Sequence, residues 1–199
     1  MRIAVTGGIG SGKSAVMDIL KEKKHPVFSC DEIYKEIIRD SLYIKRIGEA
    51  FPSCIKNGEI DRAELSKIVF KDKNLLNRLN EISHPLIMQR LLQKMGDIES
   101  GLIFAEVPLL FEGGFADLFD AILVVRRDMR LRLRAVALRD GLANEEIIKR
   151  MSAQFNYDKQ PESFYQNPKI FKIFNNSTLD NLKREVDIAL QTVKKRGIF

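Results

Sequence analysis

The sequence has 199 residues, of which 45% are hydrophobic and 30% are charged, proportions typical of a globular protein with a sizeable apolar core. No apolar run reaches the roughly 18 residues of a membrane-spanning helix, and the N-terminus lacks a signal-peptide pattern, so we expect a cytoplasmic protein that binds no membrane. Two cysteines and two histidines, at spacings unlike those of zinc sites or disulfide frameworks, exclude a stapled domain. The formal net charge of +6 fits a polyanionic ligand, whether a triphosphate, an acidic cofactor or a nucleic acid.

The first elements follow the order strand, loop, helix. Arg2–Thr6 is apolar in its middle, a glycine-rich stretch follows it, and Ser14–Leu20 then carries apolar residues at helical spacing. His25–Ser29 has the pattern of a second short strand, after which residues 33–38 again show helical spacing. Asp31 therefore lies where a strand ends and a helix begins.

The middle of the chain, residues 45–92, has a helical pattern and no strand of comparable strength. The pattern is interrupted at Pro52 and at residues 57–58, Asn-Gly. Asp61 starts a capping-box spacing and an apolar helix face follows it. We interpret this stretch as an inserted helical subdomain.

The last part of the chain returns to alternating strands and helices. Its predicted strands are Gly101–Ala105, Ala121–Val125 and Lys169–Phe174, and its predicted helices are Arg130–Leu138, Asn144–Met151 and Leu179–Val193. Strands that alternate with helices in this way predict an α/β fold, in which a mostly parallel sheet is covered on both faces.

The glycine-rich stretch carries the most specific motif. Gly7, Gly12, Lys13 and Ser14 satisfy G-x-x-x-x-G-K-[ST], in which the backbone N–H groups curl around phosphates, the lysine reaches the β- and γ-phosphates and the hydroxyl contacts Mg²⁺. Such a loop binds ATP or GTP; its alternative is a glycine-rich turn with a solvated lysine. The expected nucleotide contacts are Gly8, Gly10, Ser11, Gly12, Lys13, Ser14 and Ala15, with Ser14 as the metal contact.

Two carboxylates follow predicted strands at the edge where functional residues of parallel sheets gather. Asp31 fits a catalytic base that accepts the proton of an attacking hydroxyl, and its alternative role is the N-cap of the following helix. Glu106 fits an acid that supports the metal and its waters, or an exposed strand-end residue. We therefore expect phosphoryl transfer from a nucleoside triphosphate to a hydroxyl.

Arginines crowd the segment after the fourth predicted strand, where a mobile helical lid could place cations over the γ-phosphate. We select Arg139 as the functional arginine of this lid. The alternative is a solvated basic face or a nucleic-acid patch. The six arginines are Arg126, Arg127, Arg130, Arg132, Arg134 and Arg139.

With these residues placed, the sequence resembles the dephospho-coenzyme A kinase family over nearly its whole length. The loop TGGIGSGKS from Thr6 has that family's form, and Asp31 matches the second aspartate of its strand-two motif. Further similar motifs are NGEIDRAEL at residues 57–65, LNEISHPLI at 79–87, VPLLFE at 107–112, RDG at 139–141, Gln154 and Asn175. Two positions differ: Ser29 and Glu106 each stand where the family usually has aspartate.

The resemblance implies a P-loop NTPase fold with a five-stranded parallel sheet, an inserted helical acceptor-binding subdomain and a helical lid. Its boundaries are a core of residues 1–30, 101–126 and 168–199, an insertion of about 31–100 and a lid of about 127–167. Around Asp61, Arg62, His84 and Pro85 the insertion is implied to hold the acceptor. For His84 the alternative is a structural role as a helix-start residue before Pro85.

The implied reaction uses ATP, with Mg²⁺, to phosphorylate the ribose 3′-hydroxyl of dephospho-CoA, giving CoA and ADP in the last step of CoA synthesis. Asp31, Lys13 and Arg139 are its expected catalytic residues. The partners are the two small-molecule substrates, with no nucleic acid expected and the oligomeric state left open. Two alternatives remain: a kinase for another small nucleotide acceptor, and a nucleotide-binding regulator attached to RNA.

Overall fold

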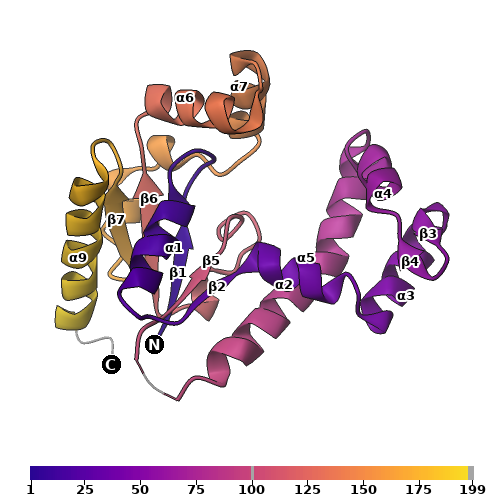
Figure 1. Cartoon of the computed structure of the whole chain (residues 1–199), viewed down its shortest axis with the longest axis horizontal. Coiled ribbons are helices and arrows are strands. Elements are labelled where there is room, and N and C mark those ends of the chain that lie inside the picture. Colours follow the sequence, from indigo (N-terminus) through magenta and orange to yellow (C-terminus); the bar gives the residue numbers. More distant parts are fainter. Residues whose placement is uncertain (100, 197–199) are drawn as a thin grey trace. The chain divides into compact units, whose positions relative to one another are not determined.

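The computed structural model describes residues 1–99 and 101–196, and its course along the chain is shown in Figure 1. The chain forms two compact units: the first comprises residues 1–27 and the chain from residue 98 on, and the second comprises residues 28–97. Among the described residues, no helix is both long enough and apolar enough to cross a membrane.

A five-stranded sheet organises the first unit, in the order β2-β5-β1-β6-β7. Its strands are β1 (Arg2–Thr6), β2 (Val27–Ser29), β5 (Ile103–Glu106), β6 (Ala121–Arg126) and β7 (Ile170–Phe174). The central strand β1 pairs in parallel with β5 and β6, and β6 pairs in parallel with β7. The predicted parallel α/β sheet is confirmed, and the carboxyl ends of these strands share one edge.

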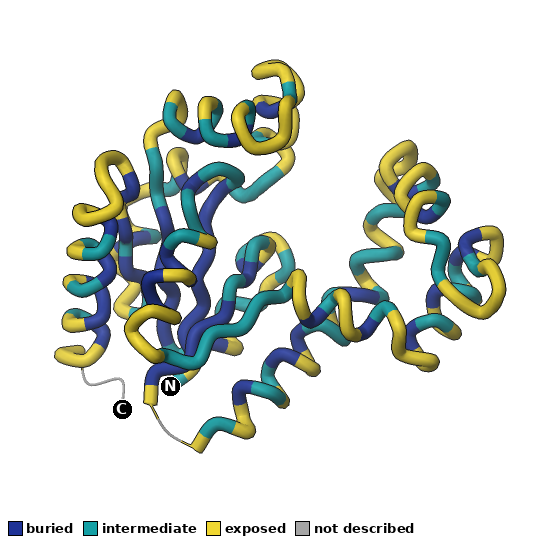
Figure 2. Tube along the Cα trace, in the orientation of Figure 1, coloured by how far each residue is buried: buried dark blue, intermediate teal, exposed yellow. Residues whose placement is uncertain are grey.

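The core of this unit lies between the sheet and two helices, α1 (Lys13–Glu22) and α9 (Leu179–Lys195). β1 is a strand because it is short and apolar, and its residues Ile3–Val5 are fully buried. Figure 2 shows the central strands dark blue along their length, whereas α9 is buried along one stripe only. Burial of these strands on both faces makes them a rigid support for the loops at their ends.

Two helices follow β6, α6 (Met129–Asp140) and α7 (Asn144–Ser152), and they pack on each other. Gly141 ends α6 in the left-handed region at φ +67°, a conformation that glycine adopts without strain. The chain continues through the short helices η3 (Tyr157–Lys159) and α8 (Glu162–Tyr165). Here Phe155 stacks on Phe111, from the loop after β5, with ring centroids 4.8 Å apart, so this return segment is anchored by aromatic packing.

The second unit is built around the 24-residue helix α5 (Lys73–Gly96), which contacts three other helices. These are α2 (Cys30–Ile37), α3 (Ser41–Ala50) and α4 (Arg62–Val69). A buried hydrogen bond of 2.7 Å joins the Tyr43 hydroxyl of α3 to the Ser83 hydroxyl of α5. Asp61 caps α4 by accepting the Glu64 N–H at 3.0 Å, as the capping-box spacing predicts.

In residues 45–92, where the sequence shows no strand of comparable strength, the structure contains two strands of two residues each. After α3 and a short helix, η1 (Pro52–Cys54), the strands β3 (Ile55–Lys56) and β4 (Glu59–Ile60) pair as an antiparallel hairpin. Its two turn residues, the Asn57-Gly58 pair, both have positive φ, of 52° and 80°, as the tight turn of a hairpin requires. The two strands escaped notice because each has only two residues, too few for an alternating pattern.

The interpretation of His84 as a helix-start residue is wrong. His84 and Pro85 lie inside α5, which begins eleven residues earlier at Lys73 with Asp72 as its N-cap. Proline lacks an N–H, so Pro85 removes one hydrogen bond from the interior of the helix. Packing of α5 against three neighbouring helices keeps the helix continuous through this position.

Candidate active site

The glycine-rich loop joins β1 to α1 and makes close contacts with two side chains. Gly12 lies at φ +97°, and a β-carbon placed there would overlap the side-chain nitrogen of Asn175. A β-carbon at Gly8 would likewise overlap the Arg132 guanidinium. The loop therefore requires glycine both for its backbone conformation and for the space around it.

Helix α1 begins with its backbone N–H groups uncapped by any described side chain, because Gly12 occupies the N-cap position. Positively polarised N–H groups at such a helix start attract anions. Lys13, the first residue of α1, folds back over the loop and donates from Nζ to the Gly7 carbonyl oxygen at 2.9 Å. Next to it the Ser14 side chain is exposed, as a metal-contacting hydroxyl must be.

The Ser11 hydroxyl adds an observation at the same loop. Ser11 is 1% exposed, and its Oγ has no hydrogen-bond partner among the described residues. A buried hydroxyl without a partner costs free energy unless a ligand or water satisfies it. The loop therefore fits a polar ligand, and the expected nucleotide-binding residues Gly8 to Ala15 are brought together on it.

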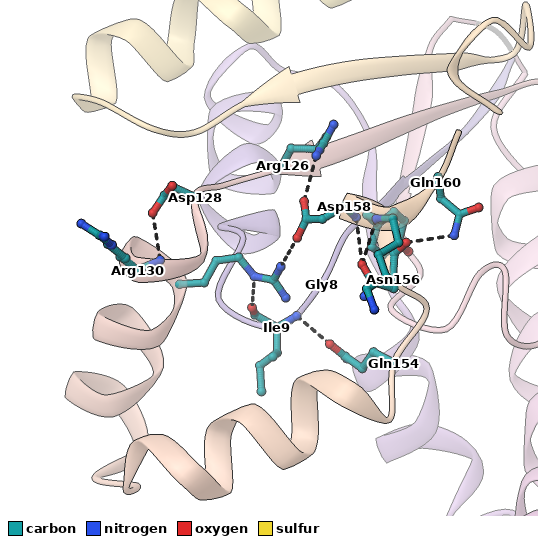
Figure 3. Close-up of polar contacts among 12 residues, drawn as sticks. Gly8, Ile9, Arg126, Asp128, Arg130, Gln154, Asn156, Asp158 and Gln160 are labelled. Atoms are coloured by element: carbon teal, nitrogen blue, oxygen red, sulfur yellow. Dashed lines mark hydrogen bonds and ion pairs between the residues drawn. The ribbon is translucent and has the colours of Figure 1, made fainter. Parts of the chain in front are cut away.

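Side chains from later segments hold the loop from outside, as Figure 3 shows. The Ile9 N–H donates to Gln154 Oε1 at 2.8 Å, and the Ile9 carbonyl accepts from Arg132 Nε at 3.0 Å. After β7, Asn175 donates from Nδ2 to the Ser11 carbonyl at 2.9 Å, and Asn175 is 9% exposed. Gln154 and Asn175, which the sequence marked only through the family resemblance, thus contact this glycine-rich loop of residues 7–14, called the phosphate loop below.

Two arginines that follow β6 contact the loop, and neither of them is Arg139, the arginine selected from the sequence. Arg132 is 9% exposed and bonds to Ile9, and Arg127 donates to the Gly10 carbonyl at 3.5 Å. Arg139 instead forms a two-point ion pair with its neighbour Asp140, at 2.7 and 2.9 Å, and its side chain is 62% exposed. The role of Arg139 in catalysis stays a prediction.

Asp31 lies in the first turn of α2, directly after β2, and is exposed. The alternative that Asp31 is the N-cap of this helix is wrong, because Ser29 takes that position and its Oγ accepts the Asp31 N–H at 3.2 Å. Ser29, one of the two departures from the family pattern, therefore has a structural role here. The Asp31 carboxylate is not used by the cap.

Glu106 is the last residue of β5 and pairs in register with Val5 of β1. It therefore stands at the carboxyl edge of the sheet, one residue before the end of β1 at Thr6, where the phosphate loop starts. Its side chain is half-buried. This position agrees with the expected strand-end acid, while its contact with a metal stays a prediction.

One candidate residue, Asp158, was not identified from the sequence. Asp158 accepts from Arg126 at 2.8 Å and from Arg132 at 3.2 Å, and it lies in η3, a segment with no motif of its own. Nothing in the spacing of residues 126, 132 and 158 indicates that their side chains meet. The cluster becomes visible only in the structure, where η3 lies beside Arg126 and Arg132.

A parallel sheet whose central strand runs into a glycine-rich loop, with lysine and serine at the start of the next helix, defines a P-loop nucleotide-binding protein. Comparison with known proteins makes this specific. The family model for dephospho-CoA kinase (CoaE) matches residues 1–165. The chain belongs to the dephospho-CoA kinase family, and its activity is the ATP-dependent phosphorylation of dephospho-CoA in CoA biosynthesis.

Relatives resemble the chain over almost its whole length. A dephospho-CoA kinase of Thermus thermophilus is 31% identical, covering 94% of this chain and 89% of its own, and one of Fusobacterium nucleatum is 34% identical, covering 97% and 98%. Among solved structures, a Thermus thermophilus protein has a TM-score of 0.80 at 30% identity, with 96% of each chain covered. A dephospho-CoA kinase from Campylobacter jejuni has a TM-score of 0.67 at 27% identity, with 98% of each chain covered.

Proposed function

We propose that this kinase transfers the γ-phosphoryl group of ATP to the ribose 3′-hydroxyl of dephospho-CoA, in the cytoplasm and with Mg²⁺. The observation that carries the proposal is the uncapped start of α1 beneath a loop that only glycine can form, with Lys13 folded over it. Backbone N–H groups there supply fixed positive dipoles for phosphate oxygens. Because these dipoles are built into the fold, they need no rearrangement when the γ-phosphate accumulates charge.

Each residue of the loop has a distinct part in this reaction. The N–H groups from Gly8 to Ala15 hold the triphosphate, and the Lys13 ammonium exchanges its loop carbonyl for phosphate oxygens. The Ser14 hydroxyl, exposed at the helix start, is the proposed ligand for Mg²⁺. When bound, Mg²⁺ neutralises phosphate charge and orients the oxygens of the transferred group.

Asp31 is the proposed general base. Its carboxylate is exposed and, because Ser29 caps α2, it is available to accept the proton of the acceptor hydroxyl. A carboxylate within reach of an attacking hydroxyl serves as a general base by accepting its proton in the transition state. The protonated aspartic acid then loses its proton to solvent after transfer, and no covalent enzyme intermediate is needed.

The acceptor is proposed to bind within residues 28–97. A cavity of about 320 Å³ in this unit is lined by Tyr34, Arg62 and His84 among others, and Arg62 lies over the Tyr34 ring at 6.0 Å from its centroid. Burial lowers the pKa of His84, so its imidazole is neutral at pH 7 and Arg62 is the cation of this group. Arg62 is therefore the proposed partner of the acceptor's phosphate charge, whereas Asp61 is occupied as the cap of α4.

The test of Asp31 compares it with a neighbour on the same helix turn. Asp31→Asn should keep ATP affinity and lower kcat by about 100-fold or more, the usual contribution of a general base. Glu32→Gln changes an exposed carboxylate of the same first turn and should leave kcat near that of the wild type. Equal kcat values in the two variants would remove Asp31 from the role of base.

The test of the acceptor measures ADP release with dephospho-CoA, AMP, CMP and pantothenate. Transfer to dephospho-CoA alone, with phosphate found on the 3′-hydroxyl, supports the proposal. Transfer only to a nucleoside monophosphate would favour the other small-acceptor kinase instead. The matched loss-of-function variant is Lys13→Ala, which should weaken both ATP binding and transfer because it removes the cation over the loop.

A further inference from the structure

A single carboxylate joins two arginines that come from different elements. Asp158, in η3, accepts from Arg126 Nη2 at 2.8 Å through Oδ1 and from Arg132 Nη1 at 3.2 Å through Oδ2. Arg126 ends β6, and Arg132 lies in the second turn of α6. Figure 3 shows the Asp158 carboxylate with a dashed line to the Arg126 guanidinium.

The arginine held in this way touches the phosphate loop. Arg132 donates from Nε to the Ile9 carbonyl at 3.0 Å, and its Nη2 fills the space where Gly8 would carry a β-carbon. Its side chain is 11% exposed, so the guanidinium has little water around it and its position depends on protein partners. The pKa of Arg132 is lowered by burial and by Arg126, and Asp158 is the carboxylate that opposes both effects.

The charge balance of the cluster favours an anion at the loop. Two guanidiniums share one carboxylate, which leaves one positive charge in addition to Lys13 beside the N-terminus of α1. Without Asp158, Arg126 and Arg132 would repel each other at short range with no compensating charge. The carboxylate therefore keeps both cations in place while leaving an excess charge for the triphosphate.

Asp158 itself is held on a rigid support. Its N–H donates to Asn156 Oδ1 at 3.1 Å, and its neighbour Tyr157 shares a buried 2.9 Å hydrogen bond with Thr6, the last residue of β1. Tyr165 also donates to the Tyr157 carbonyl at 2.6 Å. This framework ties η3 to the strand that leads into the phosphate loop, so the position of Asp158 is set by the core.

We propose that Asp158 is a positioning residue for phosphoryl transfer, whose carboxylate holds the Arg132 guanidinium against the phosphate loop, where it contacts the phosphates of bound ATP. Asp158 acts through Arg132 and touches no substrate itself. The proposal rests on ATP being the phosphoryl donor, and it adds Arg132 to the cations expected at the loop. Asp158 has no part in binding the acceptor, so its loss should affect the two substrates unequally.

The experiment measures steady-state kinetics for both substrates in Asp158→Asn and Asp158→Glu. The Asn variant keeps the size of the side chain and removes its charge; we expect kcat/KM for ATP to fall about tenfold or more while KM for dephospho-CoA stays within twofold. The Glu variant should recover most of the loss. The control is Glu162→Gln. It removes an exposed carboxylate of α8, close to Asp158 in the chain, that pairs with Lys172, and the variant should match the wild type.

A double-variant cycle with Arg132→Ala tests whether Asp158 acts through Arg132. In the Arg132→Ala background, Asp158→Asn should change kcat/KM for ATP by less than twofold. Three outcomes would each overturn the proposal. The losses in kcat/KM for ATP from the two substitutions could multiply independently, the Asp158→Asn variant could stay within twofold of the wild type, or the KM values for both substrates could rise equally. Titration calorimetry with ATP alone keeps this test separate from the acceptor: if no acceptor is phosphorylated, weaker ATP binding by Asp158→Asn with recovery in Asp158→Glu still supports the positioning role.

Discussion

The two peptide groups that flank the Cα atom of Ile9 are each hydrogen-bonded to a side chain from outside the loop. Gln154 accepts from the Ile9 N–H, and Arg132 donates to the Ile9 carbonyl. A hydrogen bond of this kind contributes about 1 kcal/mol, and one with a charged partner about 1.5 to 3 kcal/mol. Such bonds fix the orientation of both peptide groups at Ile9 before any nucleotide arrives, so binding ATP costs less ordering of the loop.

Gly12 gives a prediction at the residue scale. Gly12→Ala should lower the free energy of unfolding by about 2 to 4 kcal/mol, because alanine is strained at φ +97° and its β-carbon displaces the Asn175 amide from Ser11. ATP affinity should fall with it, since the loop cannot keep its curl. Urea unfolding and titration calorimetry measure the two effects.

Gly101 provides the matched control for this variant. It has the same φ of +97°, but an added β-carbon would meet nothing within 4 Å. Gly101→Ala should therefore carry the backbone strain alone, about 1 to 2 kcal/mol, and leave ATP affinity unchanged. If the two variants lose equal stability, the contact between Gly12 and Asn175 contributes nothing.

The arginines show where sequence reasoning reached its limit at this scale. The motif placed Lys13 and Ser14 correctly on the loop and helix, because the motif is local and its spacing fixes its geometry. The choice among six arginines had no such support, since the contact of Arg132 with Ile9 depends on how α6 packs beside the loop. Asp158 was invisible for the same reason, because it meets Arg126 only across 32 residues of chain.

The helices of this protein differ in how their first N–H groups are satisfied. Asp128 caps α6 and Thr178 caps α9 with their side chains, whereas α1 begins at a glycine with no side-chain cap among the described residues. Capping satisfies the first N–H groups of a helix internally, and an uncapped start leaves them for a ligand. Helices α7 and α8 also begin without a side-chain cap, at Ala143 and Pro161, so the uncapped start of α1 indicates a phosphate site only together with the glycine-rich motif in front of it.

Ser29 gives a prediction at the element scale, because its hydroxyl caps α2 two residues before Asp31. Ser29→Ala should lower the free energy of unfolding by about 1 kcal/mol, the usual cost of losing an N-cap, and should lower kcat because the first turn that carries Asp31 frays. Ser29→Asp should retain both, since aspartate caps helices equally well. Thermal unfolding and ADP-release kinetics check the pair; a Ser29→Ala variant with full stability would show that this cap contributes nothing.

Among the elements, length decided what the sequence could reveal. The buried strands β1 and β6 and the amphipathic helix α9 have patterns long enough to read, and their predicted bounds agree with the structure within two residues. Each strand of the β3–β4 hairpin has two residues, so the Asn-Gly turn is the only signal of the hairpin in the sequence. Pro85 led to the wrong prediction that a helix starts at His84, because proline is common in the first turn of a helix. Here tertiary packing keeps α5 continuous through the proline.

On the scale of the whole molecule, the order of strands and helices was sufficient for the fold class. Alternating elements predict a parallel sheet, and β1 at its centre carries the phosphate loop at its carboxyl end. The acceptor could not be derived in this way, because a phosphate loop leaves the second substrate open. Its identity came from several short motifs in family order, and the family model supports it over residues 1–165.

The two histidines lead to a prediction for the stability of the whole chain. Burial lowers the pKa of both His25 and His84, so the folded protein binds protons at lower pH than the unfolded chain, whose histidines titrate near pH 6.5. Stability is therefore unaffected well above pH 6.5 and falls as the pH drops below it, by at most about 1.4 kcal/mol per pH unit for each histidine. Urea midpoints at pH 7.5, 6.5 and 5.5 should decrease in that order, and a His25→Gln, His84→Gln double variant should show a shallower decrease. An unchanged slope in the double variant would assign the acid sensitivity to other groups.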